Sequence, residues 1–275
     1  VIILPPFISL LLYDVIAETS IGQLFIGGVI PGVIMMSLFM VYVLISRPSI
    51  RIIHEMSLDQ RIRVTSSSLG IVLLPVVIIV AIYSGIFTPT EVGALSVIYV
   101  VLLGLLQGRL NTIKLKSAAI AATGTTSMLF MLIVFGQYFA HFLTFEQVPQ
   151  SIAGAIIDNA GGVWAITLMI LAYIVLGMFL ESAAMLLISI PIFFPVAMEL
   201  GMDPVAFGIF AAIAMEIAQI SPPIGVNLFT IHGISKINLW TLARGAFPFL
   251  LIQVMMLYVV YFFPEIVTWL PNKMK

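Results

Sequence analysis

The chain has 275 residues, of which 62% are hydrophobic and only 8% charged, and its mean hydropathy is +1.23. This composition excludes a soluble globular domain and predicts an all-α protein that crosses the membrane several times. The formal net charge of −1 says nothing about nucleic acid, and no basic patch or aromatic platform suggests nucleic-acid binding. The absence of cysteine excludes disulfides, cysteine metal sites and thiol catalysis.

The first element along the chain is a double proline, Pro5 and Pro6, followed directly by apolar sequence. Because proline lacks an N–H, we expect a helix to be interrupted here and to restart as a short half-helix. An acidic turn over residues 14–18 follows, and residues 24–45 are long enough to cross a bilayer. We take residues 1–46 as the end of a first structural repeat. A repeat that opens on its own break indicates the C-terminal portion of a longer protein.

Residues 47–64 are the most polar segment and contain four arginines. Since basic loops favour the cytoplasmic side, this segment is predicted to be a cytoplasmic loop or an interfacial helix. We assign residues 65–275 to a second repeat, whose first span crosses outward over residues 69–84. The run Thr88-Pro-Thr-Glu91 then predicts a helix start, with a hydroxyl cap and a glutamate in the first turn.

The next span is predicted over residues 92–106, and basic residues behind it indicate a return to the cytoplasmic side. These residues are Arg109, Lys114 and Lys116. A further span is predicted over residues 123–140. An outer loop is expected over residues 141–150, and a short interfacial helix over residues 148–162.

Residues 163–195 are apolar but are interrupted near the middle by the run Gly177-Met-Phe-Leu-Glu-Ser-Ala183. Each arm is short for a full crossing, which predicts a re-entrant helical hairpin whose tip stops at the midplane. Glu181 at such depth costs about 2.5 kcal/mol or more, so it requires a cation or a hydrogen-bond donor nearby. The alternative is two ordinary spans that meet at a surface turn.

A broken helix is predicted over residues 205–235, because Pro222 and Pro223 cannot continue a helix. Ser221, which precedes them, is pushed toward extended geometry, and Gly225 allows the chain to turn and restart. Broken helices at membrane depth are the usual architecture of ion and solute sites, because freed backbone groups can serve as ligands. A proline kink with a purely structural role is the alternative. Residues 239–262 form the predicted final span.

The two breaks are copies of one pattern. Ile3-Leu-Pro-Pro6 repeats as Ile220-Ser-Pro-Pro223, at an offset of 220 − 3 = 217 residues. The same offset pairs Leu11 with Leu228, Gly28 with Gly245, and Pro31 with Pro248. The turns behind the breaks differ in charge, acidic in the first copy and basic in the second, so they are expected on opposite faces of the membrane. This predicts an inverted-topology repeat, as in many secondary transporters.

Three runs in this order resemble the large membrane subunit of TRAP transporters, the tripartite ATP-independent periplasmic carriers. They are Gly85-Ile-Phe-Thr-Pro-Thr-Glu-Val-Gly-Ala94, Leu200-Gly-Met-Asp-Pro-Val-Ala-Phe-Gly208 and Glu216-Ile-Ala-Gln-Ile-Ser-Pro-Pro-Ile-Gly-Val-Asn-Leu-Phe229. The chain departs from the family pattern in three places. Glu181 stands where the family often has Asp, and Ala218 and Gln219 replace a usual glycine and an apolar residue.

The resemblance implies Na⁺-coupled uptake of small organic anions, such as carboxylates and sialic acid-like acids, across the inner membrane of a bacterium or archaeon. It also implies an elevator-type motion, a periplasmic substrate-binding protein that delivers the solute, and a small four-helix membrane subunit. Catalysis is not expected, and no cofactor is expected beyond Na⁺ as the coupling ion. Glu91 is then a candidate contact for the binding protein, although helix capping explains the same residue.

The candidate ligands are the oxygen-bearing groups of the two breaks and of the hairpin tip. The predicted Na⁺ ligands are Pro5, Pro6, Gly177, Ser182, Ser221, Pro222, Gly225 and Asn227, and the predicted solute contacts are Glu181, Ser182, Ser221 and Asn227. Carbonyl and amide oxygens are hard ligands that suit Na⁺, and a bound cation would offset both Glu181 and an anionic solute.

Other function classes stay open. A self-sufficient Na⁺/dicarboxylate symporter or anion exchanger of related fold would need no binding protein. A channel would need a pore lined by one sign of charge, and no run that could form such a ring is visible. An intramembrane enzyme would need a motif such as His-Glu-x-x-His or Gly-x-Ser-x-Gly in apolar sequence, and neither occurs.

Overall fold

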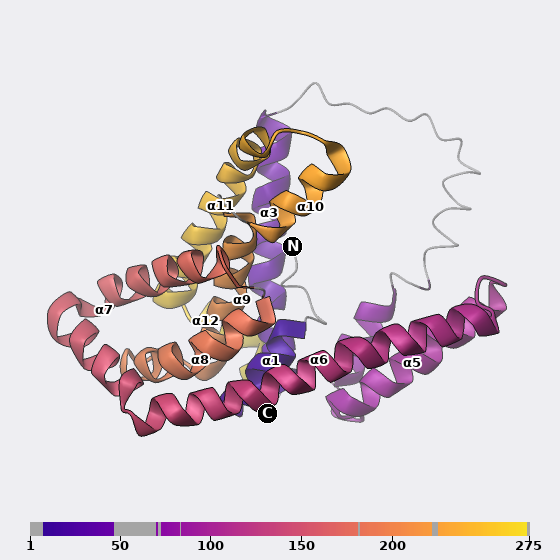
Figure 1. The fold of residues 1–275 in the computed structure, drawn as a ribbon, viewed down its shortest axis with the longest axis horizontal. Coiled ribbons are helices and arrows are strands. Elements are labelled where there is room, and N and C mark those ends of the chain that lie inside the picture. Colours follow the sequence, from indigo (N-terminus) through magenta and orange to yellow (C-terminus); the bar gives the residue numbers. More distant parts are fainter. Residues whose placement is uncertain are drawn as a thin grey trace. The chain divides into compact units, whose positions relative to one another are not determined.

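The computed structural model describes residues 8–46, 70, 73–82, 84–180, 182–221 and 225–273. Within these ranges all regular structure is helical (Figure 1), which confirms the all-α expectation. Five described helices are long and apolar enough to cross a bilayer, which confirms the polytopic expectation. They are Ile21–Ser46, Pro89–Leu106, Thr112–Phe145, Ser182–Glu199 and Leu239–Phe262.

The chain divides into two compact units, residues 1–39 with 129–275, and residues 40–128. The core of the first unit is α9 (Pro204–Ile220), whose residues from Val205 to Ala218 are all buried. A helix that is apolar all round needs neighbours on every side. Around α9 pack α1 (Ile8–Ala17), α2 (Ile21–Gly27), α7 (Val148–Gly177), α8 (Ser182–Glu199), α10 (Val226–Ser235), α11 (Leu239–Phe262) and α12 (Glu265–Asn272).

The start of α9 is fixed by a cap and by a tyrosine from α1. Asp203 accepts hydrogen bonds from the backbone N–H groups of Val205 (2.8 Å) and Ala206 (3.2 Å), which satisfies two of the free donors of the first turn. The hydroxyl of Tyr13 donates to the carbonyl of Pro204 at 2.7 Å. Helix α9 therefore begins at a well-anchored start.

The backbone pattern behind the first break recurs behind the second. Helices α1 and α10 have 10 residues each. Each ends at a residue with positive φ, Glu18 (50°) and Lys236 (59°), so that the offset here is 236 − 18 = 218 residues. The following helices begin at Ile21 and Leu239, again at an offset of 218. The repeat is thus visible in local structure, while its inverted orientation in the membrane stays a prediction.

Helices α7 and α8 form a helical hairpin. They pack along each other, Ser189 donates a hydrogen bond to the Tyr173 hydroxyl at 3.1 Å, and the rings of Tyr173 and Phe193 lie 5.4 Å apart. The connecting turn begins at Met178, inside the predicted interruption. That the hairpin is re-entrant stays a prediction, because α8 has the length and composition to cross a bilayer.

The expected short helix over residues 148–162 is wrong as a separate element, because α7 runs continuously for 30 residues from Val148 to Gly177. Gly162 looks like a helix breaker in the sequence. In the structure a side chain at this position would collide with the hydroxyl of Tyr261 on α11. The role of glycine here is to allow the close approach of α7 and α11. The helix continues through it.

Helix α6 (Thr112–Phe145) also exceeds its predicted bounds, and the outer loop expected over residues 141–150 is wrong. Only Glu146 and Gln147 separate α6 from α7. The early start has a local cause, because the Asn111 side chain accepts from the backbone N–H of Lys114 at 2.9 Å. A helix of 34 residues is about 51 Å long, so its ends extend beyond the ~30 Å hydrocarbon core.

The second unit contains the end of α3 (Val29–Ser46), the helix Leu73–Ile82 and α5 (Pro89–Leu106). The predicted helix start at Thr88 is confirmed as a capping box. The Glu91 carboxylate accepts from the backbone N–H of Thr88 at 2.8 Å and from its hydroxyl at 2.9 Å. The polar segment over residues 47–64 lies outside the described residues.

Candidate functional site

The predicted helix break lies at the deeply packed end of α9. Helix α9 ends at Ile220 and α10 begins at Val226. Ser221 has extended geometry (φ −82°, ψ 128°), as predicted for a residue before proline, and it is only 2% exposed. Pro5, Pro6, Glu181 and Pro222, four of the predicted site residues, lie outside the described residues.

Ser221 uses its hydrogen bonds within the break. Its hydroxyl donates to the carbonyl of Ile217 at 2.6 Å, and its carbonyl accepts from the N–H of Gly225 at 3.0 Å. Because the hydroxyl proton is engaged, the hydroxyl oxygen can act only as an acceptor or as a cation ligand. This state of the hydroxyl suits a cation site.

Two backbone carbonyls converge on Gly225. A Cβ atom at this position would lie 2.6 Å from the carbonyl oxygen of Gln219 and 2.9 Å from that of Ser221. The carbonyl of Gln219 cannot accept the usual helical bond, because the residue four positions on is a proline without an N–H. Gly225 has φ −47°, which other residues can adopt, so glycine is required here for space rather than for conformational freedom.

The end of the hairpin helix α7 is seated beside this break. Gly177, its last residue, is buried against Ala218 of α9, and a Cβ at position 177 would lie 2.9 Å from the Ala218 Cα. The structure thus brings together Gly177, Ser221 and Gly225, three of the predicted site residues. The sequence had predicted them as one site from their oxygen ligands and the family resemblance, without a contact between them.

Ser182 and Asn227 occupy corresponding positions near helix starts, the first at the beginning of α8 and the second in the first turn of α10. Both are half-buried, and within the described part neither side chain makes a hydrogen bond. No described contact joins Ser182 to Asn227. Free N–H groups at a helix start attract anions, and a free amide oxygen can bind a cation, so both remain candidate ligands.

Sequence reasoning assigned no role to Glu216, which lies in the same motif. It is 6% exposed, and its Oε1 atom has no hydrogen-bond partner in the described part of the chain. The signal was available, because Glu216 is the single charged residue of an otherwise apolar helix.

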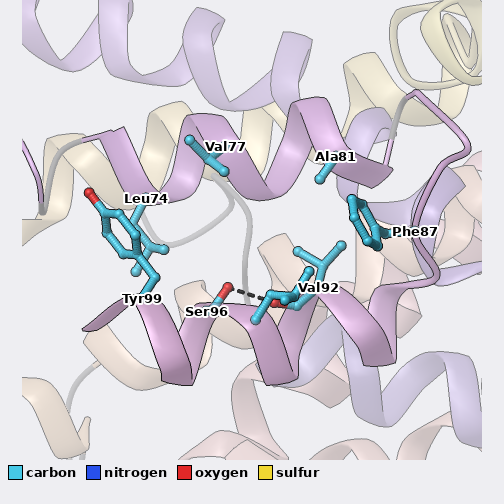
Figure 2. Close-up of a pocket in the computed structure, with 8 residues that line it drawn as sticks. Leu74, Val77, Ala81, Phe87, Val92, Ser96 and Tyr99 are labelled. Carbon is cyan, nitrogen blue, oxygen red and sulfur yellow. Dashed lines mark hydrogen bonds between the residues drawn. The ribbon is translucent and has the colours of Figure 1, made fainter. Parts of the chain in front are cut away.

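A cavity in the second unit is not suited to an anionic solute. It has a volume of about 270 Å³ and lies between the helix Leu73–Ile82 and α5 (Figure 2). Its lining is Leu74, Val77, Ala81, Phe87, Val92, Leu95, Ser96 and Tyr99. The two hydroxyls are already engaged, since Ser96 donates to Val92 at 2.7 Å and Tyr99 to Gly70 at 2.9 Å. The break beside Gly177 therefore remains the candidate site.

Glu91 provides a first test that separates capping from docking. We expect Glu91→Ala to lower the melting temperature, because two hydrogen bonds at the start of α5 are lost. Glu91→Gln keeps an acceptor oxygen and should melt close to the wild type. If Glu91 is also the predicted contact for a binding protein, Glu91→Gln should slow uptake with unchanged melting, whereas wild-type melting of Glu91→Ala would contradict the capping role.

Comparison with known proteins adds to this geometry. Residues 2–266 match the family described as "Tripartite ATP-independent periplasmic transporter, DctM component". The chain is 36% identical over 275 residues to the C4-dicarboxylate TRAP transporter large permease protein DctM of Pseudomonas aeruginosa, covering 98% of this chain and 64% of that protein.

Two further relatives cover the same 98% of this chain and 64% of their own length. The sialic acid TRAP transporter large permease protein SiaM of Vibrio cholerae is 33% identical over 274 residues. The ectoine/5-hydroxyectoine TRAP transporter large permease protein UehC of Ruegeria pomeroyi is 32% identical over 272 residues. The relatives are named as transporter permeases, not as enzymes. The chain, which spans about 64% of the length of these relatives, belongs to the family of DctM components of tripartite ATP-independent periplasmic transporters.

Proposed function

We propose that the chain forms the transport core of a Na⁺-coupled importer of small organic anions in the inner membrane of a bacterium. The observation that carries this proposal is the seating of Gly177, at the end of α7, on the broken helix at Ala218, beside two converging carbonyls. Ion and solute sites in secondary transporters are typically built from such discontinuous helices. Membership of the DctM family supports the same function.

The solute class follows from chemistry shared by the relatives. The names of three relatives specify C4-dicarboxylates, sialic acid and ectoines, which all contain a carboxylate. A carboxylate suits the N–H groups in the first turn of α10. The words "tripartite" and "periplasmic" in the family description support a periplasmic binding protein and a small membrane subunit as partners.

The proposed cation site uses oxygen atoms of the break. The carbonyls of Gln219 and Ser221 converge at Gly225. The Asn227 amide belongs to the second residue of α10, two residues after Gly225. These are the hard neutral ligands that a Na⁺ ion prefers, and a cation held there would attract an anionic solute in a medium of low dielectric constant. The bound Na⁺ would then raise the affinity for the solute, and the bound solute would raise the affinity for Na⁺. This reciprocal effect is the basis of coupled transport. Movement of the hairpin and the broken helix as one elevator body would complete the cycle.

Reconstitution tests this function. The complete transporter that contains this chain is placed in proteoliposomes with its membrane partner, and uptake of a radiolabelled dicarboxylate or sialic acid is measured. We expect uptake to require both an inward Na⁺ gradient and the binding protein. Equal uptake without the binding protein would favour the self-sufficient symporter or exchanger, and equal uptake with K⁺ in place of Na⁺ would contradict Na⁺ coupling.

Accessibility at the start of α8 provides a second prediction. The chain has no native cysteine, so single cysteines can be labelled selectively. We expect Ser182→Cys to react with a small hydrophilic thiol reagent and to be protected by Na⁺ or solute. Glu199→Cys, at the exposed other end of α8, is the matched control and should react without protection. Labelling of Ser182→Cys as fast as Glu199→Cys, with no protection, would indicate an ordinary surface turn.

A further inference from the structure

Glu216 is a buried acid that the proposed cation site does not use. We propose that the Glu216 carboxyl is a proton-binding site inside the transport core, which holds a proton in the arrangement described and exchanges it with water during the transport cycle. The only bond that changes is the O–H bond of the acid, and the proton comes from and returns to water. The exchange during transport rests on the proposed function, whereas the binding of the proton does not.

The position of Glu216 separates it from the break. Side chains on a helix lean toward its N-terminus, so this carboxyl leans toward the turn of Ala212 and Ile213 and away from Ser221. Those two residues are buried and apolar. Glu216 and Ala218 are two residues apart, about 200° around the helix, so Glu216 also points away from the seated end of α7. The carboxyl therefore leans toward apolar residues of α9 and away from the proposed cation site.

No positive charge in the described part of the chain is paired with Glu216. The charged side chains described on the seven helices around α9 are all half-exposed or exposed: Asp14, Glu199, His232, Arg244 and Glu265. The side chain of Asp158 on α7 is outside the description. Tyrosine hydroxyls from these helices bond elsewhere, Tyr13 to Pro204, Tyr173 to Ser189 and Tyr258 to Thr167, and that of Tyr261 lies against Gly162.

A second unpaired acceptor occurs on the neighbouring helix. Gln253 of α11 is 5% exposed, and its Oε1 atom also has no partner in the described part. Helices α9 and α11 are antiparallel, since Ala206 near the start of α9 and Val260 near the end of α11 line one cavity. Glu216 lies ten residues from Ala206 along α9, and Gln253 lies seven residues from Val260 along α11. Their positions along the two helix axes therefore differ by less than about one helical turn.

The Oε1 atoms of Glu216 and Gln253 are both acceptors, so these two atoms cannot satisfy each other. An ionised, unpaired carboxylate in this apolar core carries a large desolvation cost, whereas the neutral acid removes the charge and supplies an O–H donor. The proton thus provides a donor beside a carboxyl whose Oε1 atom otherwise has no partner in the described part of the chain. A change in hydration of this face during the transport cycle would shift the balance toward release of the proton.

Infrared spectroscopy of the purified transporter tests proton binding without any transport measurement. We expect the wild type at neutral pH to show the carbonyl stretching band of a neutral carboxylic acid, and Glu216→Gln to lose it. Glu199→Gln is the matched control, because an exposed carboxyl is ionised at neutral pH and its removal should leave the band intact. Full band intensity in Glu216→Gln would overturn the proposal. So would conversion of the wild-type band to carboxylate on addition of Na⁺, since the site would then hold a cation.

Glu216→Asp keeps the experiment decisive if the glutamine variant does not fold. This variant retains an acid, so its band should persist at a shifted frequency, and its absence would overturn the proposal.

The uptake measurement is made at varied pH with a fixed Na⁺ gradient and membrane potential. Wild-type uptake should fall as pH rises and the proton is lost, whereas Glu216→Gln uptake should lose this dependence. An identical pH profile in both proteins would overturn proton exchange, and Na⁺-independent uptake would contradict the proposed function alone.

Discussion

Gly177→Ala is expected to reduce uptake by about 5- to 150-fold, because the new methyl group would collide with the Ala218 side chain and unseat the end of α7. Overpacking a close contact costs about 1–3 kcal/mol, and this cost falls on the arrangement that holds the hairpin beside the break. The measurement is the initial rate of solute uptake in proteoliposomes at saturating Na⁺.

A second substitution in the same contact makes the prediction specific. Gly177→Ala combined with Ala218→Gly removes the collision between side chains but leaves the Ala218 backbone 2.9 Å from the new Cβ, so we expect partial recovery. Gly154→Ala is the matched control on α7, because a Cβ there has no neighbour within 4 Å. Unchanged uptake in Gly177→Ala, or a double variant no better than the single one, would refute the proposed seating.

Asn227→Ala is the second substitution with a large expected effect. Its side chain makes no hydrogen bond within the described part, so its loss should leave the fold unchanged and remove an oxygen ligand. One lost contact to a charge, at roughly 1.5–3 kcal/mol, raises the Na⁺ concentration for half-maximal uptake about ten- to a hundredfold. Apparent solute affinity should fall at fixed Na⁺ and recover in part at high Na⁺, as reciprocal linkage requires.

Asn238→Ala provides the matched asparagine control. Asn238 caps α11 through a 2.8 Å hydrogen bond from the backbone N–H of Trp240, and it is exposed. Its loss should lower the melting temperature while leaving the Na⁺ dependence intact. If both asparagine variants transport with wild-type Na⁺ dependence, the break is a structural kink without a cation ligand at Asn227.

Local chemistry explains which elements could be predicted from the sequence. Proline lacks an N–H, so the end of α9 before Pro222 follows from covalent structure alone. The capping box at Thr88 and Glu91 is equally local, because it spans four residues. Two helices were mispredicted: α6 begins earlier than expected although its cap at Asn111 is local, and the course of α7 depends on a distant neighbour. Gly162 continues α7 because Tyr261 packs against it, and nothing in the surrounding sequence indicates that contact.

The residues of the candidate site also fall into those that local sequence predicts and those that only tertiary packing brings together. Ser221 and Gly225 were identifiable because they flank the double proline, whereas the contact of Gly177 with Ala218 arises only from tertiary packing. The reason for glycine at position 225 also required the structure, because its φ is ordinary and the two converging carbonyls exclude a side chain. Glu216 was visible in the sequence, but that its Oε1 atom has no partner among the described residues was not.

Equilibrium binding of radioactive sodium to the complete purified transporter is the most direct test of the proposed site. The proposed site predicts saturable Na⁺ binding that excess K⁺ does not displace, that an organic anion strengthens, and that Asn227→Ala weakens about ten- to a hundredfold while Asn238→Ala does not. Absence of saturable Na⁺ binding, or wild-type binding in Asn227→Ala, would contradict a cation site at the break between α9 and α10.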